Sequence, residues 1–243
     1  MDLFIAKNPE EASTKAAEII RDVILAKEDA VLGLATGSTP IATYKKLIEM
    51  NKNGEISFKK VKTVNLDEYI GLNPDHDQSY RYFMDDNLFN HIDIDKNNTH
   101  VPTGISDDFE KDTKDYEALI DSLGHQDVQV LGIGNNGHIA FNEPNDYLEM
   151  YTHTEELTES TIEANKRFFE SADDVPRRAV SMGIGSIFKA KKIIILAFGK
   201  AKAEAVKALA DNRLTTKVPA TLLKLHPDVT LIVDEEAAEK IGK

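Results

Sequence analysis

The sequence predicts an α/β fold of the doubly wound kind, in which helices cover both faces of a mostly parallel sheet. Short apolar runs recur along the chain and alternate with segments whose apolar residues have helical spacing. The runs are continuous rather than alternating, which is typical of strands buried on both faces. No internal repeat or Pro/Gly-rich linker interrupts this pattern. We therefore expect residues 1–243 to form a single Rossmann-like domain.

The elements follow one another in a regular order. Leu3–Ala6 is a short apolar run, and Asn8-Pro9-Glu10-Glu11 after it predicts a helix start, with an N-cap, a proline at the first helical position and early acids. Further strands are expected at Ala30–Ala35, Val61–Leu66, Val128–Ile133, Lys192–Phe198 and Val229–Val233. Further helices are expected at Pro40–Met50, Asp112–Leu123, Glu159–Phe169 (with Thr158 as its cap), Lys200–Ala210 and Glu235–Ile241.

Composition narrows the class of protein. Hydrophobic residues make up 41% of the chain, enough for a sizeable core, and no apolar run approaches the ~20 residues of a membrane helix. The N-terminus lacks the layout of a secretory signal, so we expect a cytoplasmic protein without membrane contact. The absence of cysteine excludes disulfides and thiolate chemistry. A net charge of −13 argues against nucleic-acid binding, and an anionic ligand would need local amides and cations to hold it.

In a doubly wound sheet, ligands bind beyond the carboxyl ends of the strands. The first such end is Leu34–Pro40, where a turn of small residues leads into a helix. Backbone N–H groups at a helix start favour an anion, Gly37 permits close approach, and Ser38 and Thr39 add hydroxyl donors. The turn matches neither a P-loop nor the dinucleotide fingerprint, and by itself an ordinary capped turn explains it equally well.

Two adjacent acids, Asp67 and Glu68, directly follow the strand Val61–Leu66. This is where a general base would be placed, although a pair of solvated loop acids is the alternative. Neighbouring side chains on an extended segment point in opposite directions. We therefore expect one of the two carboxylates to face the pocket.

The segment Gly132–Pro144 concentrates Gly, Asn, His and Glu after another strand. Its glycines allow a tight turn around a ligand, and His138 titrates near neutrality. Glu143, five residues further on, is placed to orient the imidazole or perturb its pKa. A lone histidine is more often structural, but this setting favours a functional one.

Two cationic residues are further candidates for binding an anionic ligand. Arg167 lies in the polar stretch Asn165–Phe169, and Lys202 opens the helix that follows the strand Lys192–Phe198. Arginine can bind a phosphate through two hydrogen bonds, and lysine acts as a point charge. Either side chain could equally belong to the solvated surface.

Taken together, these segments resemble the glucosamine-6-phosphate deaminase family. The matching stretches are Leu34–Pro40, Asn65–Leu72 (NLDEYIGL), Gly132–Pro144 (GIGNNGHIAFNEP) and Asn165–Phe169. The resemblance implies that the enzyme converts glucosamine 6-phosphate and water to fructose 6-phosphate and ammonia without a cofactor or metal. It implies that Asp67 moves a proton between C2 and C1 of the open-chain sugar. It also implies that His138 opens the ring with support from Glu143 and Asn136. The phosphate would be held by Gly37, Ser38, Thr39, Arg167 and Lys202.

Two departures from the best-known long members of the family have consequences. Those members carry Asp at the position of Asn136, whereas shorter bacterial members resemble this chain in carrying Asn. Since Asn cannot ionise, Glu143 must be the main carboxylate partner of His138. The long members are also hexamers activated by N-acetylglucosamine 6-phosphate, through Ser, Arg and Lys positions that correspond here to Asp146, His153 and Glu155. We therefore expect no such activation and no obligate hexamer, and a monomer is the simplest alternative.

Two other functions are compatible with a fold of this kind. A 6-phosphogluconolactonase-type hydrolase would use a His-assisted water and would not need an enolisation base at Asp67. A sugar-phosphate-binding protein without catalysis would have lost that base or His138, and both are present. The sequence therefore favours the deaminase.

Overall fold

A seven-stranded parallel sheet forms the centre of the computed structural model, which describes residues 1–166, 169, 171 and 174–242. Its strand order is β1-β10-β9-β6-β2-β3-β5. The strands are β1 (Asp2–Ala6), β2 (Val31–Leu34), β3 (Lys62–Asn65), β5 (Thr99–His100), β6 (Val128–Gly132), β9 (Ile193–Ala197) and β10 (Val229–Asp234). The predicted doubly wound fold is thus confirmed, and each strand expected from the sequence is present to within one residue at either end.

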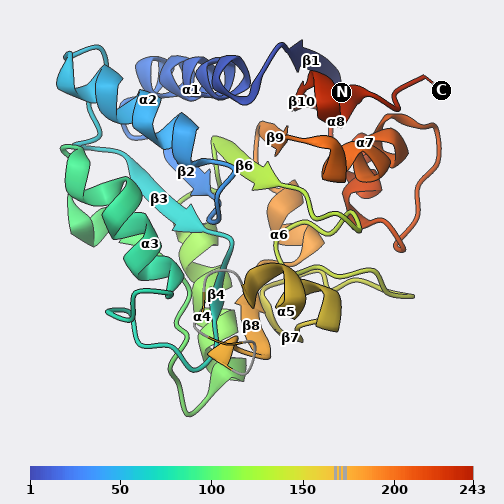
Figure 1. Ribbon diagram of the computed structural model, residues 1–243. Helices are drawn as coiled ribbons and strands as arrows, with labels where there is room; N and C mark the ends of the chain where they lie inside the picture. The colour runs from blue at the N-terminus through green and yellow to red at the C-terminus, as the bar shows by residue number, and fades with distance from the viewer. Residues whose placement is uncertain (167–168, 170, 172–173, 243) are drawn as a thin grey trace.

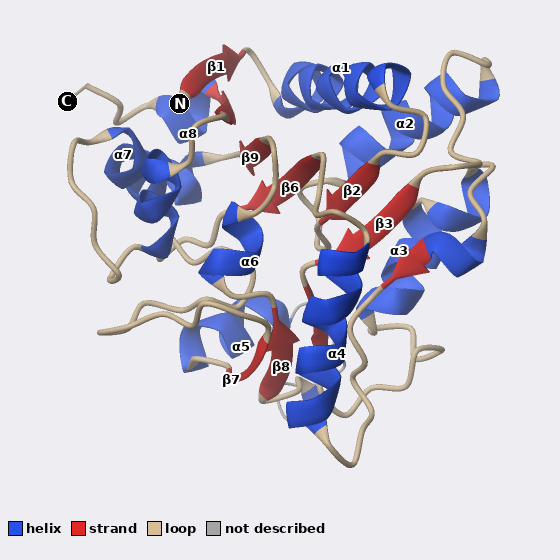
Figure 2. Ribbon diagram, turned by 180° about the vertical axis from the view of Figure 1, so that it is seen from behind, coloured by secondary structure: helices blue, strands red, loops and turns tan. Residues whose placement is uncertain are grey.

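Helices lie on both faces of this sheet. They are α1 (Pro9–Ala26), α2 (Ile41–Lys52), α3 (Tyr80–Asn87), α4 (Phe109–Ser122), α5 (Glu159–Asn165), α6 (Ile184–Phe188), α7 (Ala203–Ala210) and α8 (Glu235–Ala238). Figures 1 and 2 show α1 and α2 side by side on one face and α4 and α6 on the other. The chain runs from β2 to β3 in one direction and from β6 to β9 in the opposite direction, so the strand order reverses between β2 and β6. This reversal is the expected place for a ligand.

Helix ends follow the capping residues. The Asn8 side chain accepts the N–H of Glu11 at 2.9 Å, with Pro9 at the first helical position, as predicted. α4 begins three residues before the expected Asp112, because the Asp108 carboxylate accepts the N–H of Lys111 and starts the helix there. At the other end of the chain, α8 stops at Ala238 rather than Ile241, and α7 is preceded by the short 3-10 helix η5 (Lys200–Lys202).

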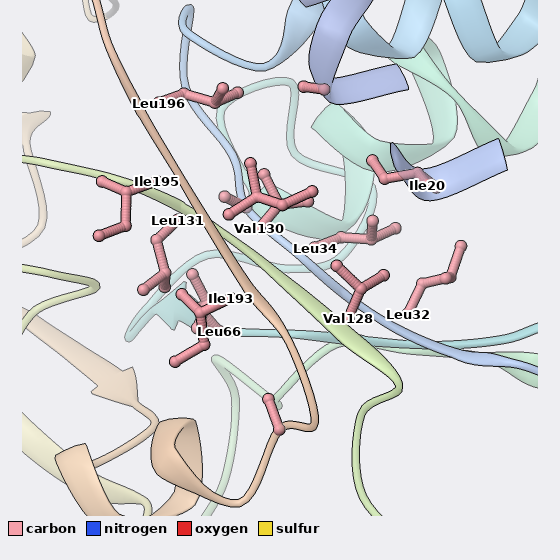
Figure 3. Packing of buried hydrophobic residues seen from close by; sticks show 14 of the residues in the cluster. Ile20, Leu32, Leu34, Leu66, Val128, Val130, Leu131, Ile193, Ile195 and Leu196 are labelled. Carbon is pink, nitrogen blue, oxygen red and sulfur yellow. The ribbon is translucent and has the colours of Figure 1, made fainter. Parts of the chain in front are cut away.

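The apolar strands form the core. All five residues of β9 are buried, and so are Val128, Val130 and Leu131 of β6. Figure 3 shows Val128 and Val130 of β6 close to Leu34 of β2, and Ile193 and Ile195 of β9 close to Leu131. Burial of each such side chain stabilises the fold by roughly 1.5–3 kcal/mol. The core therefore fixes the strand ends from which the functional loops begin.

A second, antiparallel sheet lies beyond the carboxyl ends of the main strands. It consists of β4 (Asp67–Tyr69), β8 (Arg178–Ser181) and β7 (His153–Glu156), with β8 in the middle. Figure 1 shows it below the main sheet and next to α5. The chain passes directly from β3 into β4, so a strand of the main sheet delivers Asp67 to the small one. Among the described residues, no helix is long and apolar enough to cross a membrane.

Candidate active site

A cavity of about 700 Å³ opens where the strand order reverses. The loops after β2, β3, β6 and β9 line it, together with α5 from the side of the small sheet. The structure brings together most of the residues predicted from the sequence, and those that line the cavity are Gly37, Ser38, Thr39, Asp67, Asn136, His138 and Lys202. Glu143 is buried beside the cavity and contacts two of its lining residues, Asn136 and His138. Arg167 lies outside the described residues.

The turn after β2 forms one wall. Gly37 has φ +85°, a left-handed conformation that glycine adopts without strain. The start of the turn is held from behind, because the Tyr44 hydroxyl donates to the Ala35 carbonyl at 2.5 Å and accepts the Ala35 N–H at 3.2 Å. Lys202, at the start of α7, lines the same cavity. The turn of small residues at the start of α2 and the Lys202 side chain thus line the same cavity, and backbone N–H groups at a helix start favour an anion.

Asp67 and Glu68 point in opposite directions, as their place on an extended segment predicts. Asp67 lines the cavity, whereas the Glu68 carboxylate turns toward the first turn of α3. There it accepts the N–H groups of Tyr69 and Tyr80 at 2.8 Å and of Arg81 at 3.0 Å. Both acids are buried, so they are not solvated loop residues.

Burial makes Asp67 a weak acid. Desolvation, with a further contribution from the Glu68 charge, raises the pKa of Asp67 to about 8. Desolvation also raises the pKa of Glu68, to about 7, although its three backbone donors oppose the shift. A carboxyl with a pKa near neutrality can take up and release a proton at physiological pH, which is the property a general base needs.

A second cluster surrounds the imidazole. His138 Nδ1 lies 3.4 Å from Glu143 Oε2, and Asn136 Nδ2 donates to the same oxygen at 2.9 Å. The side-chain oxygen Oδ1 of Asn136 accepts the backbone N–H of His138 at 3.1 Å. Burial alone would raise the pKa of Glu143, but the charge and hydrogen bond of His138, with donors from Thr161 and Asn136, lower it instead. Glu143 is therefore an ionised partner for the imidazole.

The backbone of the loop explains its unusual sequence. A side chain at Gly134 would place a Cβ atom 2.4 Å from His138 Cε1, so only glycine leaves room for the ring. Ala140, which also lines the cavity, has φ +50°, an uncommon conformation for a residue with a side chain. Residues held in such conformations cluster at functional sites.

Four further lining residues were not singled out from the sequence: Tyr80, Phe141, Thr161 and Asn165. The rings of Tyr80 and Phe141 are stacked, with centroids 6.2 Å apart and an interplanar angle of 4°. The Thr161 hydroxyl donates to Glu143 Oε1. For Asn165 the sequence gives a signal, because it opens the stretch that contains Arg167. Phe141 belongs to the segment Gly132–Pro144, which the sequence already placed at the site. Tyr80 and Thr161 reach the cavity through long-range packing that no local pattern reveals.

Such an arrangement belongs to an acid–base enzyme whose substrate is small and carries an anionic group. The sequence profile of a family described as glucosamine-6-phosphate isomerases/6-phosphogluconolactonase matches residues 7–232. This chain belongs to that family.

Curated relatives cover almost the whole chain. A glucosamine-6-phosphate deaminase of Thermoanaerobacter pseudethanolicus is 60% identical over 241 residues, which are 99% of this chain and 95% of the relative. One of Clostridium perfringens is 56% identical over 239 residues, 98% of this chain and 99% of the relative.

Solved structures share the fold. A monomeric glucosamine-6-phosphate deaminase superposes with a TM-score of 0.97 at 47% identity, covering 99% of this chain and 100% of that one. The 6-phosphogluconolactonase of Trypanosoma brucei has a TM-score of 0.79 at 19% identity, covering 99% of this chain and 98% of that one. At that identity the second likeness shows the fold alone.

Proposed function

We propose that this chain is a cytoplasmic glucosamine-6-phosphate deaminase that works as one domain over residues 1–243. It converts glucosamine 6-phosphate and water to fructose 6-phosphate and ammonia. The observation that carries the proposal is the position of Asp67, a buried carboxyl with a pKa of about 8 in the wall of the cavity. An aldose–ketose isomerisation needs a base that removes a proton from a carbon atom. The lactone hydrolysis catalysed by the other branch of the family does not need such a base. The names of the curated relatives support the same activity.

In this mechanism the His138–Glu143 pair acts first. The imidazole takes the proton of the ring hydroxyl at C1 and returns a proton to the ring oxygen, which opens the pyranose to the aldehyde. Glu143 stabilises the imidazolium that forms, since its carboxylate lies 3.4 Å from Nδ1. Asn136 Nδ2 donates to the same carboxylate oxygen at 2.9 Å and so helps to keep that oxygen facing the imidazole.

Asp67 then acts on the open chain. It removes the proton at C2, and the enol that forms is reprotonated at C1, so that the aldose becomes a ketose imine. Water adds to C2 of the imine, and a proton passes from the added water to the nitrogen. The C–N bond then breaks, ammonia leaves, and the C2 hydroxyl loses its proton to give the ketone. The steps are proton transfers, one hydration and one elimination, in which a carboxylate and an imidazole can move the protons.

The phosphate end is held by the turn at Gly37, Ser38 and Thr39 and by Lys202, to which the resemblance adds Arg167. Because the chain carries a net charge of −13, its overall field repels a phosphate dianion. Local donors must therefore supply the binding energy, and the turn at the start of α2 faces the same cavity as Lys202.

Ammonia release from glucosamine 6-phosphate, measured in buffer without added cofactor, tests the proposal. We expect release of ammonia in equal amount to fructose 6-phosphate and almost none from unphosphorylated glucosamine. Hydrolysis of 6-phosphogluconolactone is the matched alternative assay. If the lactone were hydrolysed and no ammonia were released, the chain would belong to the other branch of the family.

A further inference from the structure

Each oxygen of the Glu143 carboxylate has its own set of contacts. Oε2 faces the imidazole of His138 and accepts from Asn136. Oε1 accepts the hydroxyl of Thr161, which reaches it from α5, an element 18 residues further along the chain. Thr161 is buried, with 4% of its surface exposed, and it lines the cavity. The carboxylate is therefore held between the catalytic loop and a separate helix.

The direction of the hydrogen bond from Thr161 is fixed by the partners of its hydroxyl. Thr158, the N-cap of α5, accepts the N–H of Thr161 at 3.3 Å, and its own hydroxyl donates to Thr161 Oγ1 at 3.1 Å. A hydroxyl has one proton. Since the ionised Glu143 carboxylate can only accept, Thr161 Oγ1 gives it that proton and accepts from Thr158. A chain of donors thus runs from the start of α5 to the partner of the imidazole.

We propose that Thr161 is a positioning residue of this enzyme: its hydroxyl holds the Glu143 carboxylate in the orientation that His138 needs for ring opening. This inference rests on the proposed function of the His138–Glu143 pair. Thr161 lies outside the sequence motif of the catalytic loop, Gly132–Pro144. The helix that carries Thr161 also carries Asn165, which lines the same cavity.

Loss of the hydroxyl has an electrostatic consequence. Burial raises the pKa of Glu143, and His138, Thr161 and Asn136 lower it. Among the described residues, the titratable side chain next to this carboxylate is His138, while α5 and the catalytic loop face it with the polar side chains of Thr161 and Asn136. Without the Thr161 donor, the pKa of Glu143 rises and the ionised pair forms only at higher pH.

Thr161→Val removes the hydroxyl at nearly constant volume, and Thr161→Ser keeps it. We expect Thr161→Val to lower kcat for glucosamine 6-phosphate by roughly 10- to 100-fold, as expected for a lost hydrogen bond to a charged group. The acid limb of its kcat/KM profile, which the ionisation of Asp67 near pH 8 sets, should stay where it is in the parent. Thr161→Ser should stay within about threefold of the parent. Thr113→Val is the matched control, since Thr113 is a buried helical threonine whose hydroxyl donates to the Glu110 carbonyl within α4 and does not line the described cavity.

A reduced, open-chain amino alditol 6-phosphate separates positioning from general damage, because it needs no ring opening. Its Kd should change by less than about threefold in Thr161→Val. An equal loss of kcat and of alditol affinity would overturn the proposal in favour of a merely structural role, and a parental kcat would overturn it as well.

Titration of Glu143 by carbon NMR of the labelled carboxyl gives a readout that does not depend on activity. We expect a higher pKa for Glu143 in Thr161→Val than in the parent, and an unchanged titration would contradict the role of the hydroxyl. If the parent itself released no ammonia while Glu143 still titrated at higher pH in the variant, the proposed function would fail and the Thr161–Glu143 coupling would stand.

Discussion

Asp67 and Ser181 are direct partners in the antiparallel pair formed by β4 and β8. The Ser181 hydroxyl also accepts the backbone N–H of Phe141 at 3.0 Å, and Phe141 belongs to the loop that contains His138 and Glu143. One buried serine therefore connects the strand that carries the proposed base to the loop that carries the imidazole. The distance between the two groups is set by backbone and sheet contacts, which suits a reaction that uses them one after the other.

The first prediction concerns Asp67→Asn. The amide keeps the shape of the side chain but cannot take up a proton. We expect turnover to fall by roughly 10²- to 10⁴-fold, the usual contribution of a positioned base, with little change in the Kd of the amino alditol phosphate. Exchange of solvent deuterium into the product at C1 should fall in parallel. Near-normal turnover in this variant would assign the base elsewhere.

The pH dependence of the parent follows from the same residue. Since the pKa of Asp67 in the ligand-free protein is about 8, the carboxyl is mostly protonated below that pH and cannot act as a base. We expect kcat/KM to rise with pH up to about 8, after correction for the separately measured titration of the substrate amine and phosphate. A profile that is flat between pH 6 and 8 would mean that the base is already ionised in the free enzyme.

Whereas kcat/KM should rise with pH, the contribution of Asp67 to the free energy of unfolding should fall as the pH rises. The folded-state pKa of Asp67 is raised above the unfolded value, so its contribution to stability is full below about pH 3.9 and is lost as pH rises through about 8. Asp67→Asn does not undergo this loss. Its Tm should therefore exceed that of the parent by a margin that grows between pH 4 and 8 and then levels off, which thermal unfolding at several pH values measures.

Gly134 offers a test of the imidazole. A Cβ atom there would lie 2.4 Å from His138 Cε1 and 2.5 Å from Nδ1, so the ring must turn away from Glu143. Gly134→Ala should reduce kcat by about 10²-fold or more, in line with loss of acid–base catalysis. Gly132→Ala, at the end of β6, is the comparison for adding a Cβ atom at the cavity wall without touching the imidazole, because a Cβ atom at Gly132 meets nothing within 4 Å. Similar activity in the two variants would argue against this packing.

Lys202 is predicted to bind the phosphate. Lys202→Ala should weaken binding of glucosamine 6-phosphate by roughly 10- to 150-fold, the value of one hydrogen bond to a charged group. Lys200→Ala controls for the loss of a positive charge, since Lys200 lies in the same short helix, is exposed and forms an ion pair with Glu239 at 3.7 Å. Equal effects of the two substitutions would indicate long-range electrostatics rather than contact.

The main sheet and its functional loops could be predicted because each depends on local sequence. The run that became β9 is apolar throughout, and the run that became β6 is apolar apart from Gln129. The Gly and Asn residues after β6 favour a loop. The small sheet could not be predicted in this way. β7 is the polar segment His153–Glu156, and β4 pairs with β8 more than 100 residues away. Strand pairing of that range leaves no periodic signal in any one segment.

The same limit applies to two polar residues of the site. The contact of Glu68 with the first turn of α3 joins residues that are 12 and 13 positions apart. The bond from Thr161 to Glu143 spans 18 positions. Neither spacing belongs to a helix, a strand or a tight turn, so the acid pair at Asp67 and Glu68 predicted a base but not the anchor beside it.

The remaining prediction concerns regulation and begins with the positions that correspond to the effector site of the long family members. Asp146 forms an ion pair with Lys217 at 2.5 Å. His153 Nε2 lies 3.4 Å from Glu155 Oε2, and Nδ1 contacts the Tyr151 carbonyl at 2.9 Å. Burial alone would lower the pKa of His153, but Glu155 and this carbonyl raise it. A proton on His153 is thus already paired with a carboxylate.

An effector phosphate would have to displace carboxylates from both cations and would meet their negative charge at close range. We therefore expect hyperbolic kinetics with no activation by N-acetylglucosamine 6-phosphate. We also expect a monomer in solution, a state reported for the deaminase of 47% identity that shares this fold. Substrate titrations with and without the acetylated sugar phosphate, together with a mass measurement by light scattering, test both expectations. Asp146→Ser combined with Glu155→Lys, which restores the residue types of the long members at two positions, serves as the comparison. Sigmoidal curves that the effector makes hyperbolic in the parent chain, or a hexamer at assay concentration, would contradict the prediction, because the paired acids at Asp146 and Glu155 would then not exclude the effector.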